Sequence, residues 1–201
     1  MSVIDDLLKD IPLPRLFRAR QRFDRPVLPD VEAACRTALS ASDVSPRIRP
    51  GMRIAVTAGS RGITGLPLVL KTVAAEIRKA GGEPFLFPAM GSHGGATAQG
   101  QREMLIGMGI TEGYVGGPIR SGMETVEIGI SDNGLPVHLD KHAHAADGIV
   151  VVNRIKPHVA FRGRCESGLM KMIVIGMGKQ KGADICHELG VGKMAENILS
   201  M

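Results

Sequence analysis

The chain has 201 residues, 44% of them hydrophobic, and its 25 Lys and Arg against 20 Asp and Glu give a formal net charge of +5. A chain of this size buries about 70% of its unfolded surface, and its longest apolar run is far below the ~18 residues of a membrane span. The N-terminus lacks the basic start and apolar stretch of a signal peptide. Three cysteines without a CxxC pair argue against a disulfide framework or a structural zinc site, so we predict a cytoplasmic protein.

Residues 1–50 are predicted to form a leader followed by one amphipathic helix. Residues 1–28 are irregular and rich in Pro and Arg, with a dense basic stretch at 14–26. The other basic residues are scattered and no aromatic stacking platform accompanies them, so we expect no nucleic-acid partner. Residues 40–51 are predicted to be a linker. The helix is predicted over 29–40, where helical spacing relates Val31, Ala34, Cys35, Ala38 and Leu39.

Residues 51–201 are predicted to form one α/β domain. Apolar runs at 52–57, 83–90 and 147–155 are typical of buried parallel strands. A hairpin is predicted over 124–140, with positive φ angles at Asn133-Gly134, and a short helix over 141–146. Further helices are predicted over 66–82, 98–109, 167–178, 183–190 and 193–201. We therefore predict an open, mainly parallel, Rossmann-like sheet with helices on both faces plus a β-hairpin.

Reactive side chains follow each predicted strand of the sheet. Arg61 follows the first strand, His93 the second, and Lys156 and His158 the third. The carboxyl ends of parallel strands line the ligand crevice of an open α/β sheet, so these side chains are expected at one edge. The small-residue loops at 58–65 and 91–97 are consistent with a cradle for phosphate or carboxylate, and equally with plain tight turns.

The histidines and one lysine each allow two interpretations. His93 and His158 have the side chain for acid–base chemistry near neutral pH, although a structural role in a turn fits each of them singly. Lys171 lies one turn after Ser167, a natural N-cap, within an apolar run. It either extends to solvent or is held beside His158 as a nucleophile or anion clamp. The spacing of His187 alone indicates a structural role.

A cluster of three further histidines invites a metal-site interpretation. His142 and His144 are two residues apart, so on a helix they point to different faces. His138 belongs to the predicted hairpin. We predict that all three are surface residues.

The ordered set of Arg61, His93, His158, Ser167-Gly168-Leu169-Met170-Lys171 and His187 resembles the amino-terminal domain of the nickel-pincer lactate racemase family. The similarity runs from about Met52 to His187. It implies a racemase or epimerase that acts on a 2-hydroxy acid by hydride transfer to a lysine-tethered cofactor. That cofactor is the nickel-pincer nucleotide, nickel pyridinium-3,5-bisthiocarboxylic acid mononucleotide.

The resemblance also implies a role for each matching residue. Lys171 would be the covalent tether, in a segment with Ser167 and Gly168, and His187 would be the nickel ligand. His93 and His158 would flank the substrate as alternating acid and base, and Arg61 would hold anionic groups. The implied partners are a small anionic substrate and the enzymes that synthesise the cofactor, with no membrane partner.

The sequence departs from the family pattern in its loops. Ala58 stands where the family has Asp, Gly62 where it has Pro, and Gly94-Gly95 where it has Arg-Pro. These changes favour a substrate larger or more anionic than lactate, held by Arg162 or Arg164. The family's second domain, which closes over the substrate, has no counterpart in 1–201, so we expect self-association and little activity from this chain alone. The alternative is a nickel-independent enzyme or binding module that recognises a nucleotide or other anionic ligand on the same scaffold.

Overall fold

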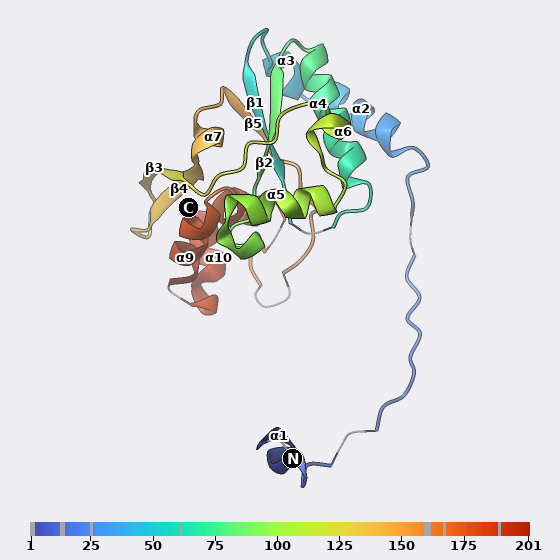
Figure 1. Cartoon of the computed structure of the whole chain (residues 1–201), viewed down its shortest axis with the longest axis vertical. Helices are drawn as coiled ribbons and strands as arrows, with labels where there is room; N and C mark the ends of the chain where they lie inside the picture. The colour runs from blue at the N-terminus through green and yellow to red at the C-terminus, as the bar shows by residue number, and fades with distance from the viewer. Residues whose placement is uncertain are drawn as a thin grey trace.

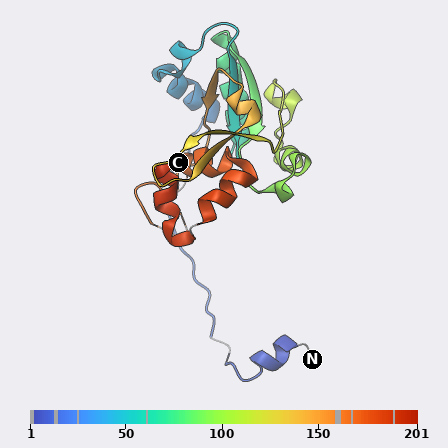
Figure 2. The same cartoon turned by 90° about the vertical axis from the view of Figure 1, so that its left-hand side faces the viewer.

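The computed structural model of the chain describes residues 3–12, 15–24, 26–60, 62–158, 162–166, 168–188 and 190–201. Every described residue from Val3 to Asp30 is exposed, including the short helix α1 (Val3–Leu8). This segment extends away from the folded part of the chain in both views (Figures 1 and 2). The folded part begins with helix α2 (Val31–Ala41).

Three parallel strands form the central sheet. They are β1 (Arg53–Ala58), β2 (Glu83–Pro88) and β5 (Gly148–Val150), in the order β2-β1-β5. In β1 and β2 every residue after the first is buried, as expected for strands covered on both faces. Together with the flanking helices and a separate hairpin, this sheet confirms the predicted α/β class.

The third strand is shorter than predicted. Its ladder with β1 ends at Val150, and the chain continues to His158 without regular strand pairing. The buried hydroxyl of Thr57 replaces the ladder, because it accepts from Val152 N at 2.8 Å. The segment 151–158 therefore leaves the sheet as a loop without regular secondary structure.

Helices α4 (Leu66–Lys79) and α2 cover one face of the sheet. The apolar stripe of α4 packs with Ile54, Val56 and Ala58, which are alternate residues of β1. Helix α2 packs on α4 and is held by hydrogen bonds of Arg36 to Glu32 and Glu76. The predicted linker contains a single helical turn, α3 (Val44–Arg47).

The opposite face of the sheet is covered by the segment that begins with α8 (Leu169–Lys171). Phe85 and Phe87 of β2 pack there with Met172 and Met177. The continuous α-helix predicted over 167–178 is not formed, because α8 passes directly into a π-helix, η2 (Met172–Gly176). π-helical turns of this kind occur frequently at functional sites.

The β-hairpin consists of β3 (Thr125–Ile130) and β4 (Pro136–Asp140). Its turn is closed by Gly134 N donating to Ser131 O at 2.9 Å and Ser131 N donating to Leu135 O at 2.8 Å. Gly134 has a φ of +80°, but Asn133 is not among the described non-glycine residues with positive φ. The prediction of positive φ at both positions was therefore wrong for Asn133.

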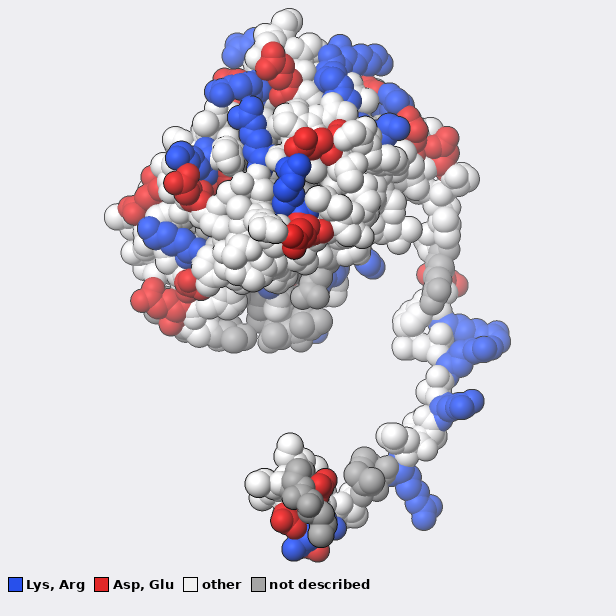
Figure 3. All heavy atoms as spheres, in the orientation of Figure 1, with Lys and Arg blue, Asp and Glu red and all other residues white. Residues whose placement is uncertain are grey.

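The remaining elements are short helices around this frame. No helix of the described residues is long and apolar enough to cross a membrane. Lys and Arg are interspersed with Asp and Glu over the visible face of the folded part, and several basic side chains lie along the N-terminal segment (Figure 3). The elements not yet placed are η1 (Gly94–Ala96), α5 (Ala98–Gly107), α6 (Glu112–Val115), α7 (Lys141–His144), α9 (Lys179–Glu188), η3 (Val191–Lys193) and α10 (Met194–Ser200).

Candidate functional site

A cavity of about 680 Å³ lies at the carboxyl ends of the sheet strands. Its walls come from the loops after β1 and β2, the extended segment after β5, and the helices α8 to α9. As expected from the parallel order of the strands, these loops converge on one edge. Five of the predicted site residues line this single cavity: His93, His158, Gly168, Lys171 and His187.

Two other predicted site residues, Arg61 and Ser167, lie outside the described residues. Ser60 and Gly62, the neighbours of Arg61, both line the cavity. Gly168, the neighbour of Ser167, has a φ of +73° and approaches the extended segment closely. A Cβ atom added there would lie 2.9 Å from the carbonyl oxygen of Arg154. Only glycine, which has no Cβ atom, avoids this clash.

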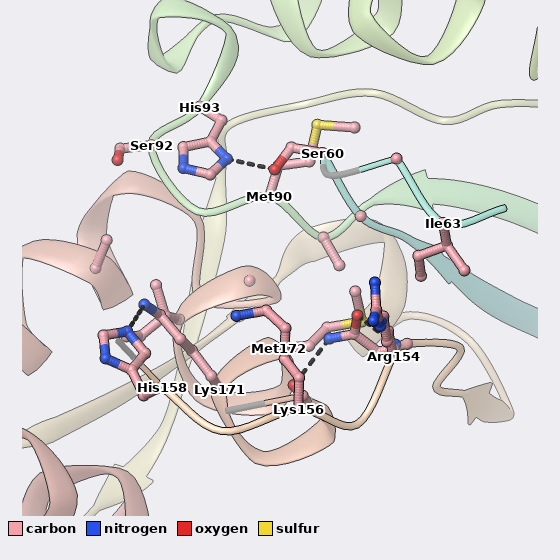
Figure 4. A pocket seen from close by; sticks show the side chains of 18 of the residues that line it. Ser60, Ile63, Met90, Ser92, His93, Arg154, Lys156, His158, Lys171 and Met172 are labelled. Atoms are coloured by element: carbon pink, nitrogen blue, oxygen red, sulfur yellow. Dashed lines mark hydrogen bonds between the residues drawn. The ribbon is translucent and has the colours of Figure 1, made fainter. Parts of the chain in front are cut away.

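His93 is held by a residue that the sequence did not single out. Ser60, in the loop after β1, forms a hydrogen bond with Nδ1 of His93, in the loop after β2 (Figure 4). A partner at Nδ1 holds the ring in one orientation, and because a hydroxyl can donate or accept, either tautomer of His93 fits this contact. Two loops from adjacent strands thus act together to place one imidazole at the cavity.

His158 and Lys171 form a second pair, on the other side of the cavity from His93 (Figure 4). Nζ of Lys171 lies 3.0 Å from Nε2 of His158. Burial, followed by the positive charges of Lys171 and Lys156, lowers the pKa of His158 below its ordinary value. A neutral imidazole can accept a proton, so His158 is suited to act as a base at neutral pH.

Lys171 itself is half-buried rather than fully buried within its apolar run. It is the last residue of α8, lines the cavity and contacts His158. Of the two interpretations of Lys171, the structure therefore shows the position beside His158 and not extension into solvent. This position leaves an amine at the wall of a cavity, which a nucleophile or anion clamp requires.

His187 is oriented by its own helix. Its Nδ1 lies within hydrogen-bond distance of the carbonyl oxygen of Ala183, one turn earlier in α9. A carbonyl can only accept, so Nδ1 carries a proton, and in the neutral ring this leaves the lone pair on Nε2, as in a histidine that binds a metal through Nε2. No group of three or more His, Cys, Asp or Glu in the described residues is placed to hold a metal ion. Any metal at His187 would therefore need other ligands from a bound group.

A buried ionic network supports the wall that carries His93. Lys179, with no exposed surface, lies 3.0 Å from a carboxylate oxygen of Asp140 and donates to the carbonyl oxygen of Pro88 at the end of β2. It also donates to Oε1 of Gln101 at 3.2 Å. The amide nitrogen of Gln101 in turn donates to the carbonyl oxygens of Gly91 (2.8 Å) and His93 (3.2 Å).

This network was missed in the sequence, although one signal was present. Lys179 directly follows the apolar run 172–178. Its position next to apolar residues, like that of Lys171, was a sign that this lysine could be buried. Its φ is +57°, a conformation that L residues rarely adopt. Burial lowers the pKa of Lys179, and the charge of Asp140 opposes that effect. The ion pair joins the start of α9 to the end of β4.

The prediction that His138 lies at the surface was wrong. His138 is only 4% exposed, because the face of β4 that carries it packs against α9. Burial is the main cause that lowers the pKa of His138, and the charge of Lys181 adds to it. His142 is half-buried and His144 is exposed, and neither lines the cavity.

One family model matches most of the chain. The family model of the lactate racemase N-terminal domain matches residues 19–197. A search of curated proteins found no match. The family match includes every residue that lines the cavity.

Proposed function

Because the chain belongs to the family of the lactate racemase N-terminal domain, we propose that it acts in a racemase or epimerase of a 2-hydroxy acid. The observation that carries the proposal is the placement of His93 and His158 on different walls of one cavity (Figure 4). A racemase needs an acid–base group on each face of its substrate, since each group is the base for one enantiomer and the acid for the other.

Each histidine is prepared for this role by its surroundings. His158 has a lowered pKa, which favours the neutral form that removes a proton from the substrate hydroxyl. Ser60 contacts Nδ1 of His93, so this ring is held in one orientation at the cavity wall. Oxidation of the hydroxy acid to a planar keto acid removes a proton from the hydroxyl and a hydride from the carbon. The histidines would take and return the proton, and return of the hydride to the other face of the carbon would invert the configuration.

The residues fit the cofactor that the family implies. Lys171 provides an amine at the cavity wall, and His187 provides an oriented imidazole at the same cavity. We propose Lys171 as the covalent tether of a nickel-pincer nucleotide and His187 as its nickel ligand. When bound, this group would supply the site that accepts hydride from the substrate carbon and returns it.

The acid–base roles are tested by His93→Gln, His158→Gln and the double variant, in protein co-expressed with the enzymes that synthesise the cofactor. Racemisation of a panel of 2-hydroxy acids is measured from each enantiomer. Each single variant should lose about 10²-fold or more in both directions, the scale expected for loss of a general acid or base. His144→Gln, which changes an exposed histidine away from the cavity, is the matched control and should be unchanged. Wild-type turnover by the double variant would exclude the mechanism.

The cofactor roles are tested by intact mass and nickel content of the same preparations. Lys171→Ala should abolish the covalent adduct, whereas His187→Ala should keep the adduct and lower the nickel content. Unchanged nickel in His187→Ala would contradict its assignment. A wild-type chain that binds nucleotides or other anions but never gains mass would favour the nickel-independent alternative.

A further inference from the structure

Two cations of the cavity wall have no role in the proposed acid–base chemistry. Arg154 and Lys156 belong to the extended segment that leaves the sheet after β5. Alternate residues of an extended chain point to one side, and Arg154, Lys156 and His158 all line the cavity. Ile155, between the two cations, is 80% exposed. Both cations therefore line the cavity along with the proposed base, as does the neighbouring Asn153.

The charge of this cavity is unbalanced. Its described lining contains Arg154, Lys156 and Lys171 but neither Asp nor Glu. Within the described residues no carboxylate forms an ion pair with Arg154 or Lys156, whereas Arg162 on the same loop contacts Glu166 at 3.5 Å. Like charges gathered at a concave surface repel one another and attract anions from solution. The cavity is thus arranged to receive more than one negative charge.

We propose that Arg154 and Lys156 form a subsite for a second anionic group of the substrate. The substrate class is then a 2-hydroxy acid that carries a carboxylate or phosphate distal to its reacting carbon. The assignment to a substrate rests on the proposed function, whereas the binding of a second anion at these residues does not.

The layout of the cavity supports a separate subsite. In Figure 4, Lys156 extends toward the middle of the cavity, with the pair of His158 and Lys171 on one side of it and Arg154 on the other. A planar guanidinium matches the two oxygens of a carboxylate or phosphate, and an ammonium adds a point charge.

A phosphate of a mononucleotide has the same chemistry as the proposed distal group, so the test separates the two sources. The full chain, without added cofactor, is titrated by calorimetry with lactate, malate and a pyridine mononucleotide. Malate is a 2-hydroxy acid with a distal carboxylate, and lactate lacks that group. Arg154→Met and Lys156→Met remove one cation each. Arg47→Met, which changes the charge equally at an exposed site of α3, is the control.

The wild-type chain should bind malate more tightly than lactate. Each cavity variant should weaken malate binding about tenfold or more, the effect of one lost charge-assisted contact, and should change lactate binding less than about twofold. Arg47→Met should match the wild type. The proposal is overturned if the variants weaken only the mononucleotide, if they leave malate unchanged, or if the wild type does not bind malate at millimolar concentrations. Binding as predicted by a chain that gains neither the covalent cofactor nor nickel on co-expression with the cofactor's biosynthetic enzymes would count against the proposed function and leave the subsite in place.

Discussion

Replacement of Lys179 by Met should be among the most destabilising single changes in this chain. The substitution keeps an unbranched side chain but removes an ammonium that lies 3.0 Å from Asp140, where both side chains have no exposed surface. Asp140 keeps hydrogen bonds from the backbone N–H groups of His142 (2.7 Å) and Ala143 (3.0 Å), but its charge loses the buried cation. Breaking a buried pair from one side costs about 3–5 kcal/mol.

That cost is large compared with the stability of the whole domain. Folded domains are typically stable by about 5–15 kcal/mol, so Lys179→Met would remove a substantial share. The carbonyl oxygen of Pro88 and Oε1 of Gln101 also lose a donor, which places the expected effect toward the upper part of the range. The measurement is urea unfolding followed by circular dichroism, with midpoints and slopes compared.

Two further variants identify the cause. Lys179→Met combined with Asp140→Asn should recover at least about 1 kcal/mol, because the buried charge is gone and Asn still accepts the two backbone hydrogen bonds. Lys141→Met removes a lysine whose pair with Glu124 is exposed, so it should leave the urea midpoint close to that of the wild type. A loss below about 1 kcal/mol in Lys179→Met would refute the reasoning, since the buried pair would then contribute no more than an exposed one.

Three other predictions follow from single contacts. Burial lowers the pKa of His138 below its ordinary value of 6.5, so as pH falls the unfolded chain binds this proton before the folded chain does, and stability should fall below about pH 6.5. His138→Gln should make the urea midpoints measured between about pH 7 and 5 depend less on pH. Parallel pH profiles for the variant and the wild type would contradict the assignment. Ser60→Ala should shift the ¹⁵N NMR signal of Nδ1 of His93, because this ring nitrogen loses its contact with the hydroxyl, and an unchanged signal would contradict the contact. Gly176→Ala should cost about 1–3 kcal/mol because its Cβ would lie 2.7 Å from a backbone carbonyl oxygen, while Gly107→Ala in α5, with open space around it, should not destabilise.

The sequence alone determined the elements whose signals are local. The apolar runs that became β1 and β2, and the helical spacing of α2 and α4, could be predicted because strand and helix periods are properties of neighbouring residues. The convergence of His93 and His158 was also predictable. Once the strands are parallel, the loops at their carboxyl ends must lie at one edge of the sheet.

Only the tertiary structure decided which groups support that edge. The contact of Ser60 with His93 and that of Lys179 with Gln101 join residues 33 and 78 positions apart, and no spacing along the chain encodes them. The burial of His138 depends on α9, which packs across β4. Local periodicity selects secondary structure, whereas the burial of a charge or a polar ring depends on which distant surface covers it, and that is fixed only when the elements pack together.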